Sequence, residues 1–206
     1  MIFPLLITAL LLAPLPVTIQ KTPAQDAIVR LARAASSIEG ADVGFTPGHL
    51  VSQRGSGPSE EVNCMPAAAA MLLRWADDRT DKSAAPPDAR MLRGQLPLDG
   101  APWRPEQVRE VLLAAGLTVD MPEISLEAMT AALRSGRALL VLVQENGLGH
   151  CYLVTAYARI GEQTVFSIVD PADGLHRAIA SDALLRRMDG YWWRFLAVGR
   201  NTTSIF

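Results

Sequence analysis

The chain of 206 residues has few cysteines, few histidines and few aromatic residues, and it has no stretch in which Lys and Arg are concentrated. Two cysteines cannot make a disulfide scaffold, and with three scattered histidines they cannot make a structural zinc cluster. Nineteen basic residues against 21 acidic ones give a net charge of −2, which argues against a protein that binds nucleic acid by neutralising phosphates. We therefore expect no metal, no cofactor and no nucleic-acid partner.

Half of the residues are apolar, and the longest apolar stretch is at the N-terminus. Residues 1–20 carry no charged side chain, and a helix of this length would cover about 30 Å, the thickness of a bilayer core. Three prolines interrupt the segment, and no basic stretch precedes it. We interpret residues 1–20 as a signal or membrane anchor, which predicts a secreted or membrane-anchored protein with membrane contact through this segment. The alternative is a translocation or packing segment of a longer protein.

Hydrophobic periodicity divides the rest of the chain into a helical part and a later strand-rich part. Residues 40–58 are rich in Gly, Ser and Pro and are expected to be irregular. Helices are predicted over 24–36, 66–78, 105–115, 125–134 and 182–188, and strands over 138–143, 150–158, 165–170 and 191–198. The order of helices followed by mostly antiparallel strands indicates an α+β fold, with the buried helix at 66–78 packed on the sheet.

Three residues of the predicted fold have the chemistry of a nucleophilic site. Cys64 lies immediately before the buried helix, where the partial positive charge of a helix N-terminus favours thiolate over thiol. His150 opens one strand and Asp170 ends the next, so an antiparallel hairpin would place them within hydrogen-bonding reach. The acid would orient the imidazole, and the imidazole would act on Cys64 as base and then as acid.

The second cysteine, Cys151, follows the histidine directly. Neighbouring side chains of a strand point to opposite faces, so we expect that Cys151 and His150 cannot both face Cys64. We therefore interpret Cys151 as a buried apolar residue, and we do not expect a disulfide between the two cysteines.

Three motifs in this part of the chain resemble those of a known family. They are NCMPAA at 63–68, GHCYLVTAY at 149–157 and IVDP at 168–171. In this order and spacing they resemble the papain-like double-glycine peptidases, bacterial enzymes that process bacteriocin leaders as parts of ABC exporters, as stand-alone relatives or as secreted effectors. The resemblance covers about residues 59–174.

The resemblance implies a papain-like cysteine peptidase domain over 59–206, behind a helical and irregular lead-in at 21–58. Cys64 would be the nucleophile, His150 the general base and acid, and Asp170 the orienting group. The expected activity is cleavage after small residues of the Gly-Gly type by a secreted or effector-type bacterial enzyme, with a peptide or protein substrate and an immunity or inhibitor protein as partners. The alternatives are an acyl transferase or amidase that uses the same triad, and a degenerate module that only binds peptides.

The chain departs from the family pattern at two positions. The family has glycine after the cysteine, where this chain has Met65, a side chain that narrows the space beside the nucleophile. The oxyanion donor of the family is a glutamine six residues before the cysteine, and Pro58 at that position has no donor. Gln53 and Asn63 are the two candidates to replace it, together with the backbone N–H of the cysteine.

Overall fold

The computed structural model describes residues 39–57, 60–77, 87–94, 101–189 and 194–201. The predicted leader at 1–20, the predicted helix at 24–36, Pro58 and the first residues of the predicted last strand lie outside the described residues. In the part that is described, none of the helices combines the length and the hydrophobicity needed to cross a bilayer.

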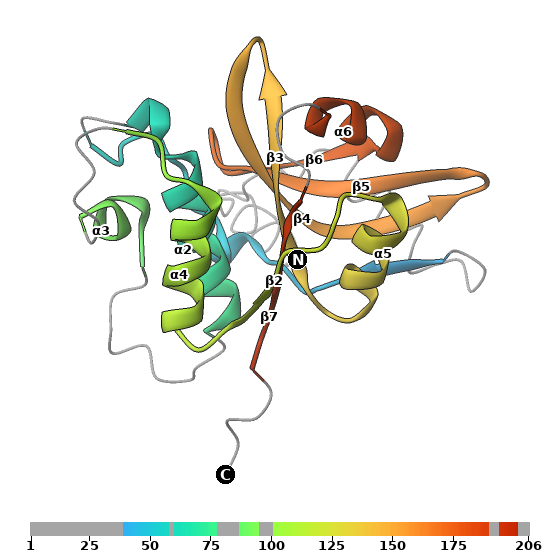
Figure 1. The fold of residues 1–206 in the computed structure, drawn as a ribbon, viewed down its shortest axis with the longest axis horizontal. Helices are drawn as coiled ribbons and strands as arrows, with labels where there is room; N and C mark the ends of the chain where they lie inside the picture. The colour runs from blue at the N-terminus through green and yellow to red at the C-terminus, as the bar shows by residue number, and fades with distance from the viewer. Residues whose placement is uncertain (1–38, 58–59, 78–86, 95–100, 190–193, 202–206) are drawn as a thin grey trace, which may run out of the picture.

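The centre of the fold is an antiparallel sheet that contains seven strands in the described residues. Its order is β2-β7-β3-β4-β5-β6, and β1 pairs with the part of β4 that lies beyond the first residue of β3 (Figure 1). The strands are β1 (Gly40–Asp42), β2 (Thr118–Asp120), β3 (Ala138–Glu145), β4 (Leu148–Ile160), β5 (Gln163–Asp170), β6 (Leu175–Ala180) and β7 (Leu196–Gly199).

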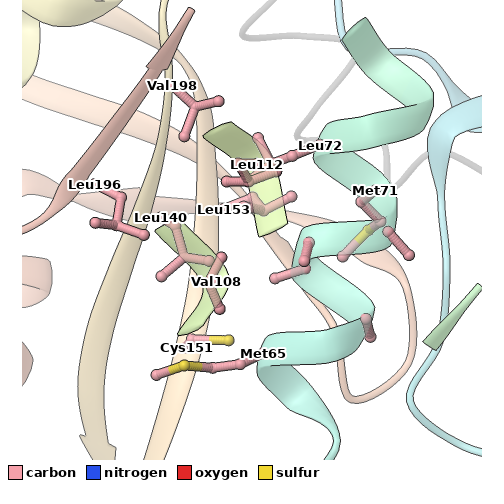
Figure 2. Close-up of a cluster of buried hydrophobic side chains, with 14 of the residues drawn as sticks. Met65, Met71, Leu72, Val108, Leu112, Leu140, Cys151, Leu153, Leu196 and Val198 are labelled. Carbon is pink, nitrogen blue, oxygen red and sulfur yellow. The ribbon is translucent and has the colours of Figure 1, made fainter. Parts of the chain in front are cut away.

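Helices cover both faces of this sheet (Figure 1). On one face lie α2 (Cys64–Ala76), α3 (Ala89–Arg93) and α4 (Pro105–Ala114). On the other face lie α5 (Leu126–Arg134) and α6 (Ser181–Met188). Two hydrophobic clusters therefore stabilise the fold, one on each side of the sheet, and Figure 2 shows the cluster on the α2 side.

The central strand β3 explains why both faces must be covered. Leu140 and Leu142 belong to the cluster on the α2 side, whereas Leu139 and Val141 belong to the cluster on the α5 and α6 side. All four are at least 95% buried, which is the reason for the unbroken hydrophobic run in the sequence. This part of the prediction is confirmed, as is the α+β fold with the cysteine-bearing helix packed on a mostly antiparallel sheet.

The lead-in segment is less irregular than its composition predicts. Residues 40–42 form β1, and a Cβ atom on Gly40 would lie 2.8 Å from the carbonyl oxygen of Tyr157. Glycine is therefore what allows this strand to approach β4 so closely. The expectation of an irregular segment from 40 onward is wrong for these three residues. Glycine in a sequence usually indicates a loop, but here Gly40 allows β1 to pack closely against β4.

Candidate active site

Cys64 is the first residue of α2, two residues earlier than the predicted start of the helix. The helix begins after Asn63, whose carbonyl oxygen accepts the first intrahelical bond, from the N–H of Ala67 at 3.0 Å. The residues that follow Cys64 are buried, whereas Cys64 itself is partly exposed. A buried helix thus presents the thiol at its N-terminus, where unpaired N–H groups and the helix dipole favour the thiolate.

A tight hairpin positions His150 opposite this helix start. Asn146 and Gly147 link β3 to β4 as a two-residue loop, and both have positive φ, of 50° and 79°. Asn-Gly is the pair that most readily adopts this turn, which fixes the register of the hairpin. The register places His150 opposite Val143, three residues after the turn.

The predicted approach of His150 to Asp170 is confirmed. The Nε2 atom of His150 lies 2.7 Å from Oδ1 of Asp170, and both side chains are largely buried. In the sheet, Leu153 pairs with Val169, so Asp170 at the end of β5 lies diagonally across from His150 near the start of β4. The antiparallel register is therefore what brings these two side chains together.

Asp170 is held by more groups than His150 alone. Its Oδ1 atom also accepts a hydrogen bond from the backbone N–H of Ala172 at 2.8 Å, and its Oδ2 atom accepts one from Nη1 of Arg177 at 2.9 Å. Arg177 is fixed in turn by a two-point ion pair with Asp173. Burial opposes the charge on Asp170, but the bonds from His150 and Ala172 outweigh it and hold the pKa of this carboxyl below its ordinary value.

The same imidazole interacts with Cys64. Because Asp170 engages Nε2, the nitrogen that remains for the sulfur of Cys64 is Nδ1. Burial by itself would lower the pKa of His150, but the hydrogen bonds to Asp170 and Cys64 reverse this and raise the pKa to about 9. The site therefore favours an imidazolium beside a thiolate at neutral pH.

The thiol of Cys151 is also part of this site. Its hydrogen bond to Cys64 is the largest of the effects that lower the pKa of Cys64 to about 5, ahead of the hydrogen bond to His150; burial opposes both. Cys151 is fully buried and belongs to the hydrophobic cluster on the α2 side, against which Cys64 also packs. The interpretation of Cys151 as a buried apolar residue is confirmed. The expectation that only one of Cys151 and His150 acts on Cys64 is not, because both lower the pKa of its thiol.

Cys64 packs against the cluster on the α2 side of the sheet, to which Cys151 belongs. The two neighbours on β4 do diverge as a strand requires: Cys151 joins the α2 cluster, and the ring of His150 packs edge-on against Tyr152, which belongs to the cluster on the other face. In the described sheet, β5 pairs with β4 from Leu153 onward.

Behind the histidine lies a charged cavity of about 410 Å³. Glu145 accepts a hydrogen bond from the Tyr152 hydroxyl and forms an ion pair with Arg187 at 2.9 Å. Glu145, His150 and Asp170 each bring one potential metal-ligand atom within 4.8 Å of the others. However, Arg187 is bonded to one of these carboxylates and Arg177 to the other, and two cations at these positions disfavour a divalent metal ion.

The two oxyanion candidates occupy different environments. Gln53 lies beside the end of β5, because its backbone N–H donates to the carbonyl oxygen of Pro171 at 2.8 Å. Its Nε2 atom is 3.5 Å from the carbonyl oxygen of Glu61, which is a long contact. Asn63 is 1% exposed, and its Nδ2 atom donates to the hydroxyl of Ser56 at 2.9 Å. The amide of Asn63 thus supports the turn before α2, whereas that of Gln53 is held weakly.

Met65, the departure from the family pattern beside the nucleophile, is 6% exposed. Its side chain packs in the same cluster as Cys151 (Figure 2). Its backbone N–H is hydrogen-bonded to Cys64 and contributes to the lowered pKa of the thiol.

Comparisons with known proteins find similarity in solved structures. One is the peptidase domain of Streptococcus ComA, a bifunctional ABC transporter involved in a quorum-sensing pathway; the TM-score is 0.49 at 15% sequence identity, over 74% of this chain and 98% of that chain. Another is the N-terminal peptidase-like domain of the toxin secretion ATP-binding protein from Vibrio parahaemolyticus; the TM-score is 0.40 at 19% identity, over 55% of this chain and 82% of that chain. No family model and no curated protein matches the chain.

Sequence reasoning missed two members of the site, Cys151 as a contact of the nucleophile and Arg177 as a partner of Asp170. Arg177 lies on β6, a strand that the sequence analysis did not predict. A usable signal for it was present, since Asp173-Gly174 after Asp170-Pro171 is a turn sequence, and a turn there places the next residues back alongside β5.

Proposed function

We propose that this protein is a cysteine peptidase that hydrolyses peptide bonds through an acyl-enzyme on Cys64. The observation that supports this most strongly is the imidazole of His150, which lies 2.7 Å from the carboxylate of Asp170 and whose pKa is raised by both Asp170 and Cys64. A thiol at a helix start, an imidazole and an orienting carboxylate are the three groups that nucleophilic acyl transfer by cysteine requires.

In the proposed reaction, the thiolate of Cys64 attacks the carbonyl carbon of the scissile peptide bond and forms a tetrahedral oxyanion. The imidazolium of His150 then donates its Nδ1 proton to the leaving amine, the C–N bond breaks, and a thioester remains on Cys64. The neutral imidazole next removes a proton from water, whose oxygen attacks the thioester and releases the carboxylic acid. Asp170 keeps the imidazole in the required orientation throughout.

For the oxyanion we propose the side-chain amide of Gln53 and the backbone N–H of Cys64 as donors. The loop that carries Gln53 is held next to Asp170 by the hydrogen bond from its backbone N–H to the carbonyl oxygen of Pro171. Its side-chain Nε2 makes only a long contact with the carbonyl oxygen of Glu61, so little energy is lost when it donates to an oxyanion instead. Asn63 is the weaker candidate because its amide bonds Ser56 in a fully buried position.

The proposed substrate is a peptide or protein segment with small residues before the cleaved bond. The resemblance to the double-glycine peptidases supports this preference, and so does the exposed Gly149 beside His150, where the absent side chain leaves room for a substrate backbone.

The test is to incubate the purified chain with a peptide mixture that contains Gly-Gly, Gly-Ala and bulky sites, and to identify the products by mass spectrometry. We expect two fragments from hydrolysis after small residues and complete loss of cleavage in Cys64→Ala, with an unchanged circular dichroism spectrum. A crosslinked product would instead identify an acyl transferase. A folded Cys64→Ala variant that cleaves as well as the native chain would overturn the proposal.

A further inference from the structure

Two free cysteines that are 87 positions apart in the sequence, Cys64 and Cys151, pack at the same hydrophobic cluster near the start of α2. Cys64 is partly exposed at the helix start, and Cys151 behind it is 0% exposed. Cys151 lies beside Met65 in the cluster on the α2 side (Figure 2), and Cys64, the residue before Met65, packs against the same cluster. One thiol is therefore accessible from the solvent, and the other can be reached only through the first.

We propose that Cys151 is a resolving cysteine, which forms a reversible disulfide with Cys64 after a hydroperoxide has oxidised Cys64. The disulfide would protect the nucleophile from irreversible oxidation and would switch the site off until a thiol reductant restores it. The chemistry depends only on the two thiols, and its effect on catalysis rests on the function proposed above.

The first step oxidises Cys64. The thiolate sulfur attacks one oxygen of the hydroperoxide, the S–O bond forms, and the O–O bond breaks. The leaving alkoxide or hydroxide takes the proton of the His150 imidazolium and departs as an alcohol or water. The sulfur becomes a sulfenic acid while the peroxide is reduced, and the imidazole is left neutral.

The second step joins the two sulfurs. The Cys151 sulfur attacks the sulfur of the Cys64 sulfenic acid, the S–S bond forms and the S–O bond breaks. The thiol proton of Cys151 passes to the departing hydroxide, with His150 as the neighbouring relay, and water leaves. No further oxidant is needed, because the peroxide has already accepted the two electrons that the disulfide requires.

The structure favours this order of events. Because Cys151 is sealed in the core, a peroxide reaches Cys64 first. Burial raises the pKa of Cys151, and the neighbouring Cys64 thiolate raises it further. The second effect disappears once Cys64 is an uncharged sulfenic acid, so Cys151 becomes a better nucleophile when it is needed. The two residues already pack at the same cluster beside the first turn of α2, so the proposed bond joins neighbours in the fold.

The experiment treats the full chain with hydrogen peroxide and follows the two cysteines by intact mass and by tryptic mapping. We expect the native chain to lose two hydrogen atoms and to yield a linked pair of peptides, residues 55–74 joined to residues 138–159, which a thiol reductant separates. In Cys151→Ala the same treatment should add two oxygen atoms to Cys64, and the reductant should not remove them. Cys151→Ser is a second variant in case the alanine variant does not fold, and the same irreversible product is expected from it.

The matched control is Cys64→Ala, in which the sealed Cys151 should stay a reduced thiol at the same peroxide dose. Oxidation of Cys64 in the native chain to the sulfinic acid while Cys151 stays reduced would overturn the inference, and so would a disulfide that forms only between molecules. The two proposals can fail separately. A linked peptide in a chain without peptidase activity would leave the resolving role intact, whereas an active peptidase without the linked peptide would refute it.

Discussion

Replacing Cys151 by alanine should shift the acid limb of the pH–activity profile to higher pH. In the native site the pKa of Cys64 is lowered to about 5, and the hydrogen bond from Cys151 is the largest cause. A hydrogen bond to a charged group contributes about 1.5–3 kcal/mol, which corresponds to about 1–2 pH units at 1.36 kcal/mol each. The thiol is a weak donor, so the acid limb should move from about pH 5 to about pH 6 rather than pH 7.

The assay is kcat/KM on a cleavable peptide between pH 4 and pH 10, combined with the pH dependence of alkylation of Cys64 by iodoacetamide. Both measurements should show the same upward shift, because both require the thiolate. At pH 8 the variant should recover much of the native rate, since the thiol has then lost its proton in both chains. Cys151→Ser keeps a donor at the same position and should keep the acid limb near its native value.

A packing control separates the hydrogen bond from the cavity that alanine creates. Leu153 is 0% exposed and belongs to the same cluster as Cys151, so Leu153→Val removes buried volume without removing a donor. It should lower the melting temperature and leave the acid limb in place. An acid limb that stays near pH 5 in Cys151→Ala, or that moves equally in Leu153→Val, would refute the reasoning.

Four further results follow from the geometry. The native kcat/KM should be bell-shaped with limbs near pH 5 and pH 9, because activity is lost below the pKa of the Cys64 thiol and above the pKa of the His150 imidazolium. Asp170→Asn should lower kcat by a factor on the order of 100 to 10,000 and shift the alkaline limb to lower pH, since the carboxylate that stabilises the imidazolium is gone; steady-state kinetics across pH tests both effects. Arg177→Gln should cost less than about tenfold in kcat/KM, because this ion pair is partly exposed, whereas Arg186→Gln, which removes a fully surface pair, should have no effect on the same assay. Ser125→Ala should lower the free energy of unfolding by about 1 kcal/mol in urea titrations, because the hydroxyl caps α5 by accepting from the N–H of Ala128.

The triad could be predicted because its two strand residues belong to one hairpin. Twenty residues that contain a single turn leave few ways for an antiparallel pair to form, so the start of one strand and the end of the next must meet. The cysteine was placed by a different signal, a proline and four alanines that mark a buried helix start. Local patterns such as these two predict the structure reliably because the sequence around them offers no second helix start or strand pairing that tertiary contacts could favour instead.

Other features depend on contacts that local patterns do not determine. β1 forms because Gly40 fits against Tyr157, which lies on a strand more than a hundred residues later. The Gly, Ser and Pro content of the segment that contains β1 predicts a loop instead. β6 was missed because its residues are half-exposed at the sheet edge and alternate weakly in hydrophobicity. Arg177, the residue on β6 that holds Asp170, was missed with it.

Cys151 shows that the alternation of side chains between the two faces of a strand does not by itself predict which residues act on Cys64. The rule correctly assigns Cys151 and His150 to opposite faces, and it would exclude a common target if that target lay over one face of the sheet. Cys64 instead lies at the first position of α2, and both neighbours on β4, His150 and Cys151, lower the pKa of its thiol. Two consecutive residues of one strand can therefore both act on the same sulfur. We therefore expect that substitutions at Cys151, the residue after His150, change the pKa of Cys64 while the hydrogen bond between His150 and Asp170 is kept.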